Sequence, residues 1–252
     1  MSVLSNLLES IERLLPEEIE KRSFEIITEE LKGRTFPKDQ DAIIKRVIHT
    51  SADFDYADNL CFSKDAVSIA KAAIMNGACI VTDTQMAKSG INKKSLARYG
   101  GEVFCFMSDE DVALEAKRKK VTRATISMEK AASLNKDLII AVGNAPTALV
   151  KLYELVKEGK IEPKLIIGDP VGFVNVVQAK ELIMTAGVPY IVARGRKGGS
   201  NVAAAICNAL LYQINDASLI SLLQKEQIPF VCVDAHIVKD GSLPMVEVDY
   251  FD

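Results

Sequence analysis

The chain of 252 residues carries 31 lysine and arginine residues against 34 aspartate and glutamate residues, so its formal net charge is −3. Hydrophobic types make up 48% of the residues and charged types 26%. This composition is typical of a globular protein and excludes a wholly disordered chain. The acidic balance argues against a protein that coats nucleic acid, because such proteins carry a strong basic excess.

The cysteines lie far apart and form no Cys-x-x-Cys pair, so we expect free thiols in a reducing cytoplasm (Cys61, Cys79, Cys105, Cys207 and Cys232). The first residues lack a basic region followed by an apolar core, and we expect no secretory signal there. The longest stretch without a charged residue, Gly198 to Asn215, contains several amide and hydroxyl side chains. It predicts a buried helix and not a membrane span.

The N-terminal part of the chain has the periodicity of helices. Leucine and isoleucine recur at three- and four-residue steps over Leu4–Leu15, which predicts an amphipathic first helix. A second helix is expected over Glu17–Leu31, and a third begins with Asp39 as its N-cap and runs to about Thr50. We therefore expect a helical segment before the first strand.

From Ser63 onward, short apolar runs alternate with helical stretches, and Ser63 itself is expected to cap a helix over Asp65–Asn76. The apolar runs have few polar residues and no two-residue alternation, as expected for strands that are buried on both faces (Ala78–Thr82, Glu102–Met107, Leu138–Val142, Leu165–Gly168 and Tyr190–Ala193). The alternation predicts an α/β fold in three layers, with helices on both sides of a mainly parallel sheet of about five strands.

We expect a single domain over residues 1–252, with a core over residues 17–212 and extensions at both ends. The C-terminal extension is predicted to form a β-hairpin from Phe230–Val238 and Met245–Tyr250, joined by a turn at Lys239–Ser242. His236 lies in this hairpin, and we expect it to have a solvated surface role.

Ligands of open α/β sheets gather at the carboxyl ends of the strands, and three predicted strand-to-helix loops are chemically unusual. In Gly143–Leu149 (GNAPTAL), glycine permits a tight turn and proline suits a first helical turn. The free N–H groups of that helix would face the site, although an ordinary helix start explains the pattern equally well. Asp169–Phe173 (DPVGF) is a rigid loop that a plain connection would also use.

The third loop, Arg194–Ser200 (RGRKGGS), places three cations and three glycines before a helix over Asn201–Gln213. A helix dipole disfavours cations at this end, so their presence favours a site for carboxylates or phosphates over a solvated basic turn. The loop matches neither the phosphate loop of nucleotide hydrolases nor the dinucleotide-binding fingerprint.

His49 lies on the side of the third predicted helix that faces away from its apolar residues, so it is not expected to fill the core. The helix C-terminus stabilises positive charge, which suits a proton donor. A histidine of this kind also occurs without a catalytic role. Other chemistries find little support, because the sequence has no zinc-spaced cluster, no Gly-x-Ser-x-Gly elbow and few aromatic residues for base stacking.

Several of these segments together resemble the precorrin-8X methylmutase family in order and spacing: Gly143–Leu149, Pro170–Val174, and Gly195–Ser200 followed by Ala203 and Ala204. The family's other motifs are matched by Ser23–Ile27, by His49 at the end of the next helix, by Asp83, Met86 and Gly90, and by Thr122-Arg123. Each motif alone is unspecific, but together they span nearly the whole predicted core.

The resemblance implies an isomerase of cobalamin biosynthesis that moves a methyl group from C-11 to C-12 of precorrin-8X or cobalt-precorrin-8, giving hydrogenobyrinate or cobyrinate. It implies no cofactor and no metal, and a homodimer with the corrinoid bound near the subunit interface. His49 is the expected catalytic residue, protonating or hydrogen-bonding a ring nitrogen. The expected substrate-binding residues are Arg22, Ser23, Arg123, Asn144, Ala145, Pro146, Thr147, Val171, Gly172, Arg194, Arg196, Lys197, Gly198, Gly199 and Ser200.

Two other functions stay open from the sequence. One is a carrier that holds a corrinoid without catalysis, and the other is a phosphoester-using α/β enzyme with Arg194–Ser200 as its phosphate loop. Neither nucleic acid nor a membrane is expected as a partner. The sequence does not distinguish cobalt-containing from metal-free substrate, and it assigns no chemical role to the two extensions.

Overall fold

The computed structural model describes residues 11–214, 231–233 and 236–238. Its centre is a six-stranded sheet in the order β1-β6-β5-β4-β2-β3. The strands are β1 (Leu60–Phe62), β2 (Cys79–Thr82), β3 (Val103–Phe104), β4 (Leu138–Val142), β5 (Leu165–Gly168) and β6 (Tyr190–Ala193). All pair in parallel except β1, which runs antiparallel to β6. The sheet is therefore mainly parallel, as predicted.

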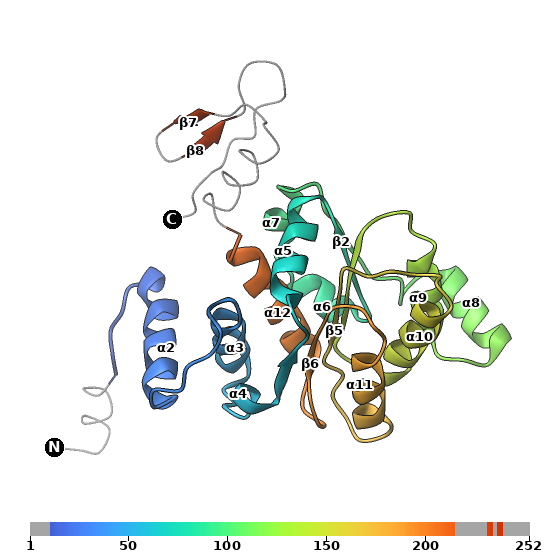
Figure 1. The fold of residues 1–252 in the computed structure, drawn as a ribbon, viewed down its shortest axis with the longest axis horizontal. Coiled ribbons are helices and arrows are strands. Elements are labelled where there is room, and N and C mark those ends of the chain that lie inside the picture. The colour runs from blue at the N-terminus through green and yellow to red at the C-terminus, as the bar shows by residue number, and fades with distance from the viewer. Residues whose placement is uncertain (1–10, 215–230, 234–235, 239–252) are drawn as a thin grey trace.

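Helices cover both faces of this sheet (Figure 1). One face packs against α3 (Lys38–Ser51), α5 (Ala66–Met75) and α12 (Ser200–Tyr212), with the short α6 (Gln85–Gly90) and α7 (Lys93–Ala97) beside them. The other face packs against α8 (Glu110–Lys119), α9 (Arg123–Ala132), α10 (Pro146–Lys157) and α11 (Val176–Met184). The molecule thus has three layers, with α4 (Tyr56–Asn59) at one edge of the sheet and α2 (Pro16–Glu30) packed outside α3.

Strands buried on both faces explain the continuous apolar runs. Along β4, Ile139 and Ala141 enter the core beneath α3, α5 and α12, whereas Leu138, Ile140 and Val142 enter the core on the opposite side. Because successive strand residues point to opposite faces, both faces need apolar side chains, and no polar alternation remains. The long charge-free stretch forms the buried helix α12, as predicted.

The sequence prediction missed one strand and misplaced two helix caps. β1 has three residues and lies at the edge of the sheet, too short for a periodic signal. Ser63 does not cap α5, because its hydroxyl accepts a hydrogen bond from the Tyr190 N–H at 2.9 Å, and Asp65 takes the N-cap position with φ 57°. The N-cap of α3 is Pro37 instead of Asp39.

Only parts of the predicted first helix and of the predicted C-terminal hairpin lie among the described residues. Residues 11–15 are not helical, and the rest of the predicted first helix lies outside the described residues. The predicted strand Phe230–Val238 is divided into β7 (Val231–Val233) and β8 (His236–Val238), which pair with each other in antiparallel. The predicted turn Lys239–Ser242 and the strand Met245–Tyr250 lie outside the described residues.

The predicted free thiols hold for the four cysteines whose side chains are described, Cys61, Cys79, Cys105 and Cys207. Within the described parts of the chain, each helix is too short or too polar to cross a lipid bilayer.

Candidate active site

The carboxyl ends of the parallel strands point toward the lower edge of the molecule in Figure 1. Chain connections lead from β2 outward to β3 in one direction, and from β4 to β5 and β6 in the other. The strand order therefore reverses between β2 and β4, which is where open α/β sheets form a ligand crevice. All three predicted loops begin at this edge, after β4, β5 and β6.

Asp83, directly after β2, organises the crevice. Its buried carboxylate accepts hydrogen bonds from the backbone N–H groups of Gly143 at 2.8 Å, Asn144 at 2.9 Å and Ala145 at 2.7 Å. Burial raises the pKa of Asp83, and the three N–H groups oppose that rise. These three N–H groups come before Pro146, the first residue of α10, and an internal carboxylate uses them, so contact of this loop with a ligand stays a prediction.

Hydroxyl groups and close backbone packing join the neighbouring loops to this one. Gly143 lies so near the start of α12 that an added Cβ would stand 2.6 Å from the Ser200 Cα. The Ser200 hydroxyl is 2.8 Å from the Thr84 hydroxyl, and the Thr122 hydroxyl is 2.8 Å from that of Thr147. Segments far apart in the sequence thus form one continuous surface around the crevice.

The loops after β5 and β6 are also in direct contact. The Gly199 N–H donates to the Asp169 carbonyl at 2.8 Å, and the Gly172 N–H donates to the Arg196 carbonyl at 3.2 Å. Gly198 packs directly on the Asp169 backbone, where a Cβ would collide with the carbonyl. Gly198 of the predicted basic loop is therefore required for close packing between two backbones.

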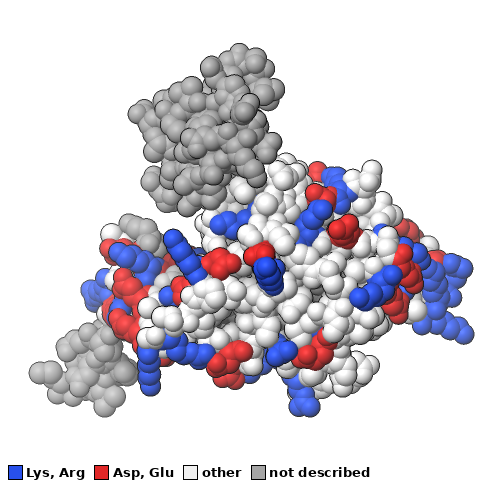
Figure 2. Space-filling model, viewed as in Figure 1, with Lys and Arg blue, Asp and Glu red and all other residues white. Residues whose placement is uncertain are grey.

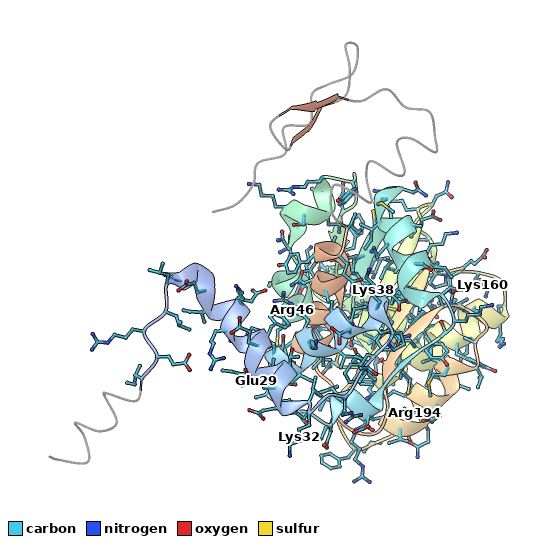
Figure 3. The ribbon with its side chains drawn as sticks, turned by 60° about the vertical axis from the view of Figure 1, so that its left-hand side comes forward. Glu29, Lys32, Lys38, Arg46, Lys160 and Arg194 are labelled. Carbon is cyan, nitrogen blue, oxygen red and sulfur yellow. The ribbon has the colours of Figure 1, made fainter. Side chains whose placement is uncertain are left out.

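The cations of the basic loop have partners of different kinds. Lys197 is held by Asp53 at 2.6 Å and Asp55 at 2.5 Å, and these carboxylates raise its pKa. Arg194 lies 3.5 Å from Glu181, and the Arg196 guanidinium lies 5.4 Å from the centre of the Phe173 ring. Figure 3 shows Arg194 at the lower edge of the molecule. A ligand carboxylate would compete with acidic side chains for Lys197 and Arg194, whereas Arg196 forms no ion pair with a described residue.

Arg123 adds a cation on the other side of the crevice. It is exposed at the first position of α9, next to the Thr122 hydroxyl that bonds to Thr147. Figure 2 shows a larger group of lysine and arginine side chains at the right-hand edge, over α8. Arg123 and the arginines of the basic loop therefore place positive charge near the carboxyl edge of the sheet, although the whole chain is acidic.

Exposed apolar side chains lie between these cations. Met86 is 69% exposed and Val171 49%, while Phe173 and Val174 are each 79% exposed. Apolar groups of this size at the mouth of a crevice suit a large ligand with apolar faces or a protein surface.

His49 lies at the end of α3, exposed as the sequence predicted. Its ring stacks on the Phe24 ring of α2, with centroids 5.4 Å apart and planes 20° from parallel. The Arg46 guanidinium also packs on Phe24, 4.8 Å from its centroid, and forms an ion pair with Glu20 at 2.6 Å. The chain after His49 leads directly to Asp53 and Asp55, which bind Lys197 of the basic loop. Sequence reasoning did not identify Phe24 as the neighbour of His49.

Arg22 and Ser23 do not join the crevice within this chain. Arg22 forms ion pairs with Glu12 at 2.9 Å and Glu25 at 3.5 Å, and the Ser23 hydroxyl donates to the Ile19 carbonyl of its own helix at 2.8 Å. No hydrogen bond or ion pair between described residues connects either one to the three loops. Both stay predictions for substrate contact.

Two ionisable groups are buried beneath the crevice. Asp169 and Lys180 are fully buried, and burial raises the pKa of Asp169 to about 7 and lowers that of Lys180 to about 8. The charge of each group acts on the pKa of the other, although the two do not form an ion pair.

This pair predicts an unusual dependence of stability on pH. The pKa of Asp169 is higher in the folded than in the unfolded chain, so its contribution is full below about pH 4 and is lost as the pH rises through about 7. We expect the free energy of unfolding to fall by about 2 kcal/mol between about pH 5 and 7.5, measured by urea denaturation. Lys180 has the opposite shift, and stability should return as it loses its proton above about pH 8.

The control is Asp169→Asn, which removes the titration and should flatten the profile between about pH 5 and 7.5. Asp137→Asn, at an exposed carboxylate 3.4 Å from Lys164, should leave the wild-type slope. A wild-type profile without a fall in this interval would contradict the assignment.

The described residues contain no group of three or more histidine, cysteine, aspartate or glutamate side chains arranged to hold a metal ion. The crevice instead offers cations, hydroxyl groups and apolar side chains. This donor set suits an organic polyanion.

Comparison with known proteins adds a family match. Residues 18–213 match the family model for precorrin-8X methylmutase. The chain is 47% identical over 195 residues to the cobalt-precorrin-8 methylmutase of Priestia megaterium, an alignment that covers 77% of this chain and 87% of the relative. It is 37% identical to the precorrin-8X methylmutase of Pseudomonas aeruginosa, covering 76% of this chain and 93% of that protein.

The fold agrees with this match. The crystal structure of the precorrin-8X methylmutase from Thermus thermophilus superimposes with a TM-score of 0.71 at 37% sequence identity, covering 77% of this chain and 96% of that chain. The matched region contains His49, Asp83 and all three loops of the crevice.

Proposed function

This chain belongs to the precorrin-8X methylmutase family, and on that premise we propose that the crevice at the carboxyl edge of its sheet binds a precorrin-8 macrocycle and moves one methyl group from C-11 to C-12. The protein is an isomerase of cobalamin biosynthesis. The observation that supports this site is that loops far apart in the sequence meet around Asp83, with cations, hydroxyl groups and apolar side chains on one surface.

The substrate's chemistry matches these side chains. A corrinoid precursor carries acetate and propionate arms around a flat, largely apolar ring. Arg123, Arg194 and Arg196 can bind the carboxylates through charge-assisted hydrogen bonds, which are stronger than neutral ones. Phe173 and Val174 can pack against the ring. Tight placement of the macrocycle limits the reacting carbons to one geometry and lowers the entropic part of the barrier.

The reaction needs no atoms beyond the substrate. The bond from C-11 to the methyl carbon breaks, the bond from C-12 to the same carbon forms, and the ring π electrons shift in a sigmatropic rearrangement. A proton or hydrogen bond supplied to a ring nitrogen by His49 draws electron density from the migrating centre and is returned afterwards. The aromatic stack on Phe24 limits the orientations of this imidazole.

The relatives that are 44–47% identical to this chain are named cobalt-precorrin-8 methylmutases. We therefore propose the cobalt-containing macrocycle as the natural substrate.

We also propose a homodimer in the cytoplasm, with the corrinoid bound near the subunit interface. The α2 helix supports this proposal, because Ile19 is 54% and Ile26 37% exposed on a side that no described residue covers. In that assembly Arg22 and Ser23 could reach the partner's crevice. Free thiols fit a reducing compartment.

The test is incubation of the purified protein with cobalt-precorrin-8 and, separately, with precorrin-8X. We expect a change in the visible spectrum at unchanged product mass, faster with the cobalt form. The shifted methyl group is located by NMR on product labelled with ¹³C in that methyl.

Binding without turnover would support the corrinoid carrier instead. A stability increase with nucleotides and none with corrinoids would support the phosphoester enzyme. A faster reaction of the metal-free macrocycle would overturn the cobalt assignment alone.

A further inference from the structure

Lys180 is a fully buried lysine whose ammonium group donates two hydrogen bonds to the basic loop. It lies on α11, and its Nζ donates to the carbonyls of Gly195 at 3.1 Å and Lys197 at 2.7 Å. Burying a charge costs free energy unless polar groups compensate, so an apolar side chain would fill this part of the core at a lower cost. What it contributes is the position of two backbone carbonyls in the middle of the loop.

Asp169 holds the two ends of the same loop. Its Oδ1 accepts from the Ala193 N–H at 2.7 Å, and its backbone carbonyl accepts from the Gly199 N–H at 2.8 Å. Its Oδ2 is fully buried and has no hydrogen-bond partner among the described residues. Asp169 and Lys180 therefore fasten the loop between Ala193 and Gly199 at four points from beneath.

We propose that Asp169 and Lys180 are positioning residues that hold the 194–199 loop in its binding conformation and make corrinoid binding weaken as the pH rises. The proposal rests on the function proposed above, since the loop is taken to bind substrate carboxylates. Neither residue is exposed, so neither is expected to touch the substrate. Both act through the backbone and through the electrostatic potential at Arg194 and Arg196.

The direction of the pH effect follows from the charges. As the pH rises through about 7 and then about 8, the pair passes from one positive charge to none and then to one negative charge. Each step makes the electrostatic potential at the basic loop less positive, so the loop attracts carboxylates less strongly.

The neighbouring groups do not cancel this change. Tyr56 of α4 and Cys207 of α12 both have raised pKa values and stay neutral through this interval. Lys197 and Asp53 stay paired, because each stabilises the charged form of the other. Glu181 forms an ion pair with Arg194 at 3.5 Å.

The experiment compares Lys180→Met and Asp169→Asn with a matched control, Lys157→Met. Lys157, the last residue of α10, also donates to two carbonyls, those of Thr185 at 3.2 Å and Ala186 at 3.0 Å, but these follow α11 and do not belong to the basic loop. The first measurement uses the full-length protein without ligand. Brief trypsin digestion, followed by mass spectrometry, gives the rates of cleavage after Arg194, Arg196 and Lys197. We expect faster cleavage in Lys180→Met and the wild-type rate in Lys157→Met.

The second measurement is the Kd for hydrogenobyrinate between about pH 6 and 9, from absorbance titration. For wild type we expect weaker binding as the pH rises. Lys180→Met should bind about tenfold more weakly near neutral pH, because the site loses a nearby positive charge and its loop is no longer held. Asp169→Asn should lose the change in Kd near pH 7, because asparagine does not titrate there. Asparagine has nearly the same size as aspartate, so the packing is kept.

Unchanged cleavage in Lys180→Met, or faster cleavage without weaker binding, would overturn the proposal. If Lys180→Met does not fold, the wild-type and Asp169→Asn titrations decide it, and identical pH profiles for the two would overturn it. If the wild type binds no corrinoid at any pH, the proposed function fails, whereas the trypsin measurement still tests whether Lys180 holds the loop.

Discussion

Replacing His49 with alanine is expected to lower the rate of methyl migration about 100-fold or more while corrinoid binding stays close to that of the wild type. A positioned proton donor contributes about 10²- to 10⁴-fold to rate, and His49 is exposed at the end of α3 with its ring stacked on Phe24. The imidazole acts on electrons that move during the reaction, so its loss should affect turnover more than affinity. Single-turnover absorbance changes and a separate titration with hydrogenobyrinate measure the two effects.

The control is Thr50→Ala, the next residue of the same helical turn, which is also exposed. It should keep wild-type turnover. Phe24→Leu should reduce the rate less than His49→Ala, because the imidazole is then present but less well oriented. Near-normal turnover by His49→Ala would remove this residue from the mechanism.

The Asp83→Asn variant is expected to lose about 3 kcal/mol or more of unfolding free energy, and turnover with it. The buried carboxylate accepts hydrogen bonds from three backbone N–H groups, and hydrogen bonds to charged groups contribute about 1.5–3 kcal/mol each. An asparagine of the same shape brings an NH₂ group against N–H donors and leaves buried groups unpaired. Urea denaturation at neutral pH measures the loss.

Asp137→Asn serves as the matched control, because Asp137 is exposed just before β4 and its carboxylate forms an ion pair with a surface lysine, Lys164, at 3.4 Å. Surface ion pairs contribute about 0–1 kcal/mol, so its stability should change little. A similarly small loss in Asp83→Asn would mean that the loop over Gly143–Ala145 does not depend on this carboxylate.

The sheet was predictable because its strands are buried on both faces. The run Leu138–Val142 is short and continuously apolar, as a buried parallel strand is, and its bounds agree with β4. β1 was not predictable, because three residues at a sheet edge carry no period. The prediction of a cap at Ser63 was wrong for a different reason. The Ser63 hydroxyl accepts a hydrogen bond from Tyr190 of β6, a residue far along the chain that a local sequence pattern does not include.

The loops of the site were predictable from composition, since glycine, proline and arginine cluster after three strands. The residues that hold these loops were not, because Asp83 contacts residues about 60 positions away and Asp169 contacts Ala193 on the next strand. A usable signal did exist. Lys180 shares one face of its helix with Val176, Ala179 and Ile183, all buried, and a lysine on an apolar face points to a buried partner.

The crystal structure of the protein with bound hydrogenobyrinate tests the central claim most directly. The account predicts that the macrocycle lies at the carboxyl edge between β2 and β4, with its carboxylates on Arg123, Arg194 or Arg196 and with His49 of one subunit or its partner against the ring. A macrocycle bound at another surface, or one that His49 of neither subunit touches, would contradict it.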